Sequence, residues 1–249
     1  MLNVVLLLII YSFLGWIVEC TYCVLGTGVW INRGFLYGPF IPIYGFGAVL
    51  VLGAINYLPN NIFIIFLGSI IITSILEYLT SYLMELFFHT RWWDYSELPF
   101  NLNGRICLLN SLLFGVAFVV VYYLINPQIM KLLNQFSYEF KLGFLTAAIL
   151  YFMIDFIISV KSALHLTFKL ETLRNIRLAL IDKYHHLEHE LNLSQIEIKL
   201  HNHNDELINK FRSLKSNLNR FEKRLIKAFP TMKASKYQKA INELKKTIK

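Results

Sequence analysis

Residues 62–88 read IFIIFLGSIIITSILEYLTSYLMELFF, an apolar run of 27 residues with only two charged side chains, Glu77 and Glu85. A helix of about 20 residues, rising about 1.5 Å per residue, crosses the roughly 30 Å hydrocarbon core of a bilayer. The run is continuous rather than alternating, so it indicates a membrane-spanning helix and not a strand of a membrane barrel. At this length the helix is expected to tilt or to extend beyond the core.

Further apolar runs lie on both sides of this one, and we predict five spans near 2–24, 38–58, 62–88, 105–125 and 141–165. The composition agrees, because 56% of the 249 residues are hydrophobic and only 16% are charged, whereas soluble domains carry about a quarter charged residues. The sequence therefore predicts an all-α, polytopic membrane helical bundle over residues 1–165.

The net charge of +8 is concentrated in the remainder of the chain. Residues 1–168 hold six Lys or Arg against seven Asp or Glu, which leaves eighteen basic and nine acidic residues for 169–249. Basic residues favour the cytoplasmic side of membrane proteins. We therefore predict a multi-pass protein of the cell membrane, with its N-terminus outside and a cytoplasmic tail at 166–249.

The tail shows two runs of apolar residues at spacings of three and four. The runs are Leu166, Leu170, Leu173, Leu180, Tyr184, Leu187 and Leu191, and then Leu207, Phe211, Leu214, Leu218, Phe221 and Leu225. An antiparallel helical hairpin or a dimeric coiled coil, and hence a homo-oligomer, would bury them. A short helix is predicted near 236–247. The basic residues suit anionic lipid headgroups, whereas no nucleic-acid-binding module is recognisable.

Four acids lie within the apolar runs, where an unpaired charge costs several kcal/mol. Glu77 and Asp155 each fall about 10 residues from the predicted inner helix end, roughly 15 Å deep. Glu19 and Glu85 lie nearer the cytoplasm, within reach of basic side chains. Polar residues follow three helices at spacings of three and four, namely Ser12, Gly15 and Glu19; Thr73, Glu77, Thr80, Ser81, Met84 and Glu85; and Asp155, Ser159 and Ser162.

These stripes have two interpretations. They could line a hydrated polar pocket near the cytoplasmic face, or they could join helices by hydrogen bonds. The candidate substrate-binding residues of the pocket are Glu19, Arg33, Glu77, Ser81, Glu85, Arg91, Asp94, Arg105 and Asp155.

Two predicted inner loops accompany these residues. Residues 32–48, NRGFLYGPFIPIYGFGA, contain four glycines and two prolines, which favour either a broken or re-entrant start of the second span or a loop before a small-residue packing face. Residues 89–105, HTRWWDYSELPFNLNGR, combine charged, amide and aromatic groups. They suit a lid or headgroup-facing pocket, or alternatively an interfacial anchor.

No resident metal or cofactor is expected. Cys20 and Cys23 form a C-x-x-C, but they fall in a predicted span, where buried apolar thiols are the simpler interpretation. His185 and His189 have i, i+4 spacing on a polar segment, a weak indication of metal binding. No nucleophile–base pair stands out, so a lipid-modifying enzyme is the least favoured class.

Several stretches carry a family resemblance: LGWIVE at 14–19, NRGFLYGPFIPIYGFGA at 32–48, EYLTSYLMELFF at 77–88, RWWDYS at 91–96 and NLNGRICL at 101–108. Together they resemble the CmpB-type, or ABC-transporter type IV, family over residues 1–165, and RLIKAFPTMKASKY at 224–237 is similar too. The resemblance implies the membrane component of a transporter. The chain lacks G-x-x-x-x-G-K-[ST], so an ATPase would be a separate subunit. The alternative is a non-transporting scaffold whose tail recruits partners.

Overall fold

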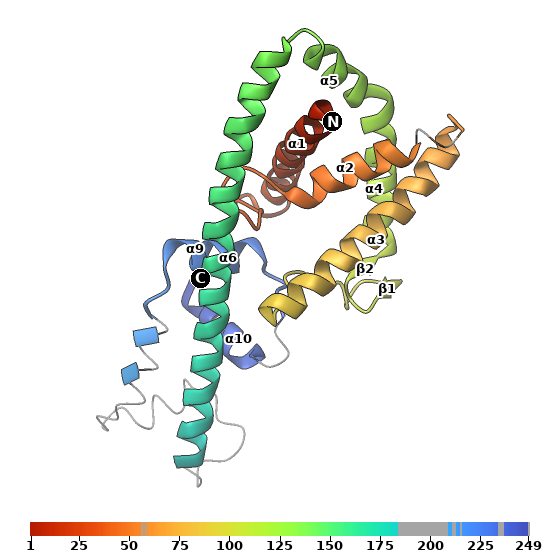
Figure 1. Ribbon diagram of the computed structural model, residues 1–249. Coiled ribbons are helices and arrows are strands. Elements are labelled where there is room, and N and C mark those ends of the chain that lie inside the picture. The colour runs from red at the N-terminus through yellow and green to blue at the C-terminus, as the bar shows by residue number, and fades with distance from the viewer. Residues whose placement is uncertain are drawn as a thin grey trace.

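A computed structural model of the chain describes residues 1–55, 57, 59–183, 209–210, 213–214, 216–233 and 237–248. Long helices make up most of this part of the chain (Figure 1). They are α1 (Leu2–Thr27), α3 (Ile62–Phe88), a continuous helical stretch from Leu108 to Leu133, and α6 (Tyr138–Lys183). All four are long and apolar enough to cross a membrane, as the sequence predicts for these regions.

The third of these stretches is longer than the predicted span at 105–125. It consists of α4 (Leu108–Val120), the π-helical turn η1 (Val121–Ile125) and α5 (Asn126–Leu133). Pro127 lies just after the π-helical turn, and because proline has no amide N–H it removes one hydrogen bond from this continuous stretch. Only residues 134–137 connect this stretch to α6, so the predicted loop at 126–140 is wrong over its first half.

The predicted span at 38–58 is not confirmed as a crossing helix. The helix there, α2 (Pro42–Ile55), has 14 residues and covers only about 21 Å at 1.5 Å per residue. Residues 28–41 before it are not helical, which agrees with the predicted broken start. The packing face is present as well, because a Cβ atom on Gly45 would collide with Leu8 O and the Ser12 hydroxyl of α1.

The two C-terminal helices of the chain pack against the C-terminal half of α6. The helix α6 continues without interruption past residue 166, so the predicted domain boundary falls inside it. Its Leu170 and Leu173 are buried in one core with Leu225 of α9 (Arg220–Ala228) and Leu244 of α10 (Gln238–Ile248). The α10 helix confirms the short helix predicted near 236–247. Trp92, from the segment after α3, joins the same core.

The predicted seam residues Leu166, Leu170, Leu173, Leu218, Phe221 and Leu225 are thus buried within one chain. The seam positions Tyr184, Leu187, Leu191, Leu207 and Phe211, and also His185 and His189, lie outside the described residues. The hairpin or dimeric coiled coil of the tail therefore stays a prediction. Residues 28–41 and 89–107 meet α9 and α10 at one end of the bundle, which we call the tail end.

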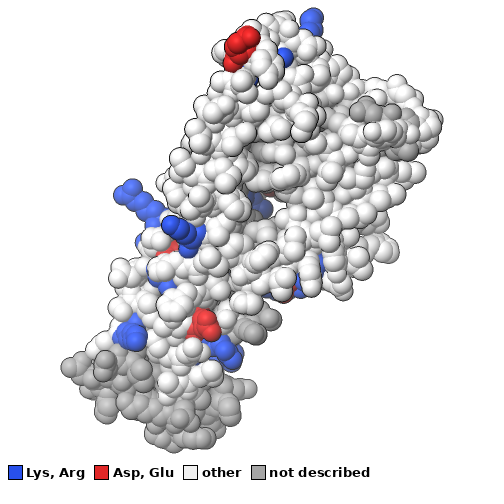
Figure 2. Space-filling view, viewed as in Figure 1, with Lys and Arg blue, Asp and Glu red and all other residues white. Residues whose placement is uncertain are grey.

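Charged side chains avoid the middle of the bundle. On the face in Figure 2, they lie at the upper tip and over the lower half, with a broad, nearly uncharged region between. Large apolar side chains on three of the long helices, such as Ile71, Leu113 and Ile154, are more than half exposed. Outward apolar surface of this extent is what a helix bundle presents to lipid.

Candidate functional site

The polar stripes of the three helices face the interior of the protein. Ser12, Thr73, Glu77, Ser81, Asp155 and Ser159 are all buried. Buried placement requires each polar group to find a partner, so the partners decide what the stripe can do. Ser12 and Thr73 donate to carbonyls of their own helices. The predicted site residues fall into three groups of contacts.

Asp155 holds the non-helical segment that precedes α2. Its Oδ1 accepts from the backbone N–H of Tyr37 at 2.9 Å, and its Oδ2 from that of Gly38 at 2.9 Å. The Ser159 hydroxyl donates to Oδ1 at 3.1 Å. Backbone outside helices has unpaired N–H groups, which must be satisfied by the protein at membrane depth. Both oxygens of the carboxylate thus have donors from the protein, which favours, at Asp155, the interpretation that the stripe joins segments by hydrogen bonds.

The residue at position 38 must be small for this contact to form. A Cβ atom on Gly38 would lie 2.8 Å from Asp155 Oδ2 and closer still to the Tyr151 hydroxyl. Only glycine lets the backbone approach the carboxylate this closely. The glycine-rich composition of residues 32–48 thus serves a buried turn between α1 and α2.

Glu77 and Glu19 form the second group, which we call the tyrosine–acid cluster, together with Tyr44 and Tyr95. The Tyr95 hydroxyl donates to Glu77 Oε1 at 3.2 Å, and the Tyr44 hydroxyl to Glu19 Oε1 at 2.6 Å. Tyr44 interacts electrostatically with Tyr95 and with both carboxylates. The four side chains come from α1, α2, α3 and the segment after α3.

One oxygen of this cluster has no partner. Glu77 is only 6% exposed, and its Oε2 makes no hydrogen bond. Burial raises the pKa of Tyr95 well above its ordinary value, and the nearby carboxylates of Glu77 and Glu19 raise it further. Tyr95 therefore stays a neutral donor. A neutral hydroxyl gives Glu77 a hydrogen bond but no compensating charge.

The Glu19 carboxylate is better compensated. Its Oε2 lies 3.8 Å from Arg33 Nε, an ion-pair distance but too long for a hydrogen bond. Arg33 also donates from Nη1 to the carbonyl of Ala228 at 2.6 Å. The predicted pairing of the shallow acid with a loop arginine is therefore present, and the same arginine joins the loop to the end of α9.

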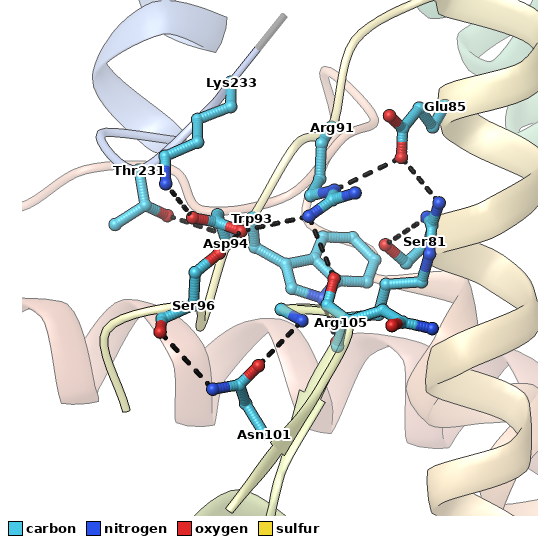
Figure 3. Close-up of polar contacts among 12 residues, drawn as sticks. Ser81, Glu85, Arg91, Trp93, Asp94, Ser96, Asn101, Arg105, Thr231 and Lys233 are labelled. Atoms are coloured by element: carbon cyan, nitrogen blue, oxygen red, sulfur yellow. Dashed lines mark hydrogen bonds and ion pairs between the residues drawn. The ribbon is translucent and has the colours of Figure 1, made fainter. Parts of the chain in front are cut away.

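The third group is a charged network at the tail end (Figure 3). Glu85 Oε2 lies 2.7 Å from Arg105 Nη2 and 3.2 Å from Arg91 Nε. Arg105 donates to the Ser81 hydroxyl at 3.2 Å, and Arg91 Nη1 reaches Asp94 Oδ1 at 3.2 Å. Five predicted site residues thus meet in one place, and their charges largely neutralise each other.

A small hairpin sets the position of this network. Its strands β1 (Asn101–Leu102) and β2 (Ile106–Cys107) are antiparallel, and Gly104 between them has φ +67, a left-handed conformation that glycine adopts without strain. The indole N–H of Trp93 donates to Arg105 O at 3.0 Å. Residues 89–105 are therefore an ordered turn that presents arginines to α3.

The tail reaches both predicted inner loops. Arg91 and Lys233 exchange backbone hydrogen bonds at 2.7 and 2.9 Å, and Lys233 Nζ forms an ion pair with Asp94 (Figure 3). Although burial opposes it, hydrogen bonds from Lys233, Ser96 and Arg91 lower the pKa of Asp94 below its ordinary value. This carboxylate thus joins the segment after α3 to the tail.

Arg224 of α9 makes the matching contact with the other loop. Its guanidinium donates to Gly34 O at 2.8 Å and to Phe35 O at 3.0 Å, and it packs over the rings of Tyr37 and Phe221. Burial lowers the pKa of Arg224 to about 10. The side chain still carries its charge at neutral pH, so the contact is a charge-assisted clamp on the loop.

A buried carboxylate anchors α9 itself. Glu222 is fully buried and lies 2.7 Å from both Lys169 Nζ and His165 Nδ1 of α6. It also completes a capping box with Asn219. A buried carboxylate needs such a set of donors, so Glu222 fixes the start of α9 against α6.

Sequence reasoning missed the partners Tyr44, Tyr95, Lys233, Glu222 and Arg224. Arg224 and Lys233 do lie in the stretch at 224–237 that carries the family resemblance, which was a usable signal. Among the residues that the structure describes, no group of three or more His, Cys, Asp or Glu could hold a metal ion. Cys20, Cys23 and Cys107 are buried and free, in keeping with apolar thiols.

The comparisons with known proteins agree with the membrane architecture. A search of curated proteins and a search of solved structures each found no match. Residues 6–160, more than half of the chain, match the family described as "Putative ABC-transporter type IV". This match spans α1 to the middle of α6 and includes all nine predicted site residues, and the chain therefore belongs to that family.

Proposed function

We propose that this protein is the membrane component of an ABC-type transporter, and that the tyrosine–acid cluster lies on its substrate path. The observation that carries the proposal is the buried Glu77 carboxylate with its unbonded Oε2. A bare carboxylate oxygen inside a membrane bundle costs several kcal/mol. A substrate group that fills the position during transport would offset that cost.

The surroundings of Glu77 support a place on a substrate path rather than a structural contact between helices. The other acids are better compensated: Asp155 has a backbone N–H donor for each oxygen, and Glu85 pairs with two arginines through Oε2. Glu77 has one hydroxyl donor for two oxygens. It lies about 16 Å from the end of α3, 11 residues at 1.5 Å each. This depth is near the middle of a bilayer, where transporters commonly bind their substrates.

The proposed orientation places the tail in the cytoplasm and the N-terminus outside. The eighteen basic residues of 169–249 support this choice, and they would lie against anionic lipid headgroups. An ATPase would be a separate subunit, since the chain has no phosphate-binding loop motif. The tail end of the bundle, where the loops and α9 meet, is the natural surface for it.

Purification of the tagged protein from its native membrane tests this proposal. Met1 is fully exposed, so an N-terminal tag should not disturb the fold. We expect native mass spectrometry to detect a nucleotide-binding subunit and the complex to hydrolyse ATP. Recovery of other partners without any ATPase would instead support the alternative, a scaffold that recruits proteins through its tail.

A further inference from the structure

We infer that the tyrosine–acid cluster binds a small protonated amine, as the substrate or as the recognised group of a larger one. The inference rests on the proposed function, whose site it names more closely. It starts from the atoms that remain unused there. Glu77 Oε2 is an acceptor without a donor, and its carboxyl group is turned toward Tyr95 by the hydrogen bond to Oε1.

Both hydroxyl groups of the cluster have already used their only proton. Tyr95 donates to Glu77 and Tyr44 donates to Glu19, so each phenolic oxygen has lone pairs left and no donor. The free groups are therefore all acceptors. A ligand that fits them must bring donors, which excludes anions and carbonyl-type groups.

The charge of the site also favours a cation. Two carboxylates belong to the cluster, and the arginines that contact Glu19 and Ser81 are already engaged. Arg33 is shared between Glu19 and the carbonyl of Ala228, and Arg105 is held by Glu85 and Ser81. Among the described residues no basic side chain pairs with Glu77. A bound cation would supply the missing positive charge and fill the open acceptor.

An ammonium group fits this arrangement better than a metal ion. Divalent metals in proteins use several carboxylate or carbonyl ligands, and no such group of three gathers in the described part of the chain. A primary ammonium carries three N–H donors. One of them can donate to Glu77 Oε2, and the other two remain for acceptors such as the tyrosine oxygens of the cluster.

The test is equilibrium dialysis of the full-length protein in lipid nanodiscs with radiolabelled methylammonium. Tetramethylammonium chloride keeps the ionic strength constant and serves as the cation without N–H donors. We expect saturable binding of one methylammonium per chain, which tetramethylammonium and K⁺ do not displace. Displacement by either cation at equal concentration would overturn the assignment to an amine.

Three variants connect the binding to this cluster. Glu77→Gln keeps the hydrogen bond from Tyr95 but removes the charge, and we expect at least about tenfold weaker binding. Tyr95→Phe removes one acceptor and should weaken binding several-fold. Glu139→Gln changes an exposed acid at the other end of the bundle and should leave binding unchanged. Equal binding by the wild type and the two cluster variants would refute the site.

The outcome separates this inference from the proposed function. Dialysis uses the purified chain without an ATPase, so binding does not depend on the partner. A complex that hydrolyses ATP but whose membrane component binds no methylammonium would retain the transporter and discard the amine. Methylammonium binding by a protein that has no ATPase partner would retain the amine site and discard the ABC-type transporter. The thermal unfolding midpoint of each variant shows whether a loss of binding reflects a loss of fold.

Discussion

Replacing Asp155 by Asn should loosen the segment before α2, and the free energy lost follows from the hydrogen bonds that the carboxylate accepts. The carboxylate accepts from two backbone N–H groups at 2.9 Å each. Asparagine keeps one acceptor oxygen and turns an NH₂ donor toward the other amide. When the NH₂ faces Gly38, that buried amide is left without a partner, at a cost of about 1–3 kcal/mol. The Tyr37 N–H keeps a second acceptor, Ser159 Oγ at 3.1 Å, and its bond to the asparagine oxygen loses about 1 kcal/mol of charge assistance.

The sum is about 2–4 kcal/mol, concentrated at Tyr37 and Gly38. Hydrogen exchange followed by mass spectrometry, on peptides covering residues 34–41 in nanodiscs, reports the opening of these amides. At about 1.4 kcal/mol per tenfold change, protection should fall by about 30- to 700-fold. Peptides from the middle of α3 should keep their protection, because α3 makes no hydrogen bond with Asp155.

Ser159→Ala is the matched control. Its hydroxyl donates to Asp155 Oδ1 at 3.1 Å and also accepts from the Tyr37 N–H at 3.1 Å, but both amides keep the carboxylate when it is removed. The expected cost is about 1.5 kcal/mol, the lower end for one hydrogen bond to a charged group. If Asp155→Asn left protection of residues 34–41 unchanged, or lowered it no more than Ser159→Ala, the carboxylate would not hold this segment. Asp155 would then have to face lipid or water.

Three further predictions concern the loop and the docked tail. Gly38→Ala should lower the thermal unfolding midpoint by several degrees, because its Cβ would collide with Tyr151 and Asp155, whereas Gly143→Ala, with open space around it, should be neutral or slightly stabilising. Asp94 has a lowered pKa, so its contribution to tail docking is complete above the unfolded value of about 4 and is lost as the pH falls through the folded value. Limited proteolysis should cleave the tail faster below that pH, and Asp94→Asn should cause the same increase at neutral pH. Arg224→Lys should weaken tail docking by about 1–2 kcal/mol, since lysine cannot keep both carbonyl contacts, while Lys223→Arg on the exposed side of α9 should match the wild type in the same proteolysis assay.

The parts of the fold that depend on nearby residues could be predicted from the sequence. The run at 62–88 coincides with α3, because continuous apolarity alone specifies a spanning helix. The pairing of Glu85 with Arg91 and Arg105 could also be expected, since all three lie close to one helix end. Both predictions need only helix geometry and the reach of long side chains.

Contacts between distant segments could not be predicted in the same way. The 46 residues of α6 include an apolar span and an amphipathic half, and composition suggested a boundary where the helix is continuous. One of the two interpretations placed Asp155 in a hydrated pocket, because nothing nearby in sequence satisfies it. Its partners, Tyr37 and Gly38, are more than a hundred residues away, and they exist only because α2 is shorter than predicted.

The different surroundings of the intramembrane acids bear on the role of Glu77. Asp155 and Glu85 receive N–H donors or arginines, which glutamine could not replace without loss. The one contact described for Glu77 is the hydrogen bond from the Tyr95 hydroxyl, and a glutamine side chain would accept that bond at no cost in buried charge. A purely structural role therefore gives no reason for a carboxyl group at this position. The ability of a carboxyl group to carry a charge or a proton does give such a reason. Glu77→Gln separates that ability from packing, because it leaves the side-chain shape and the Tyr95 contact intact.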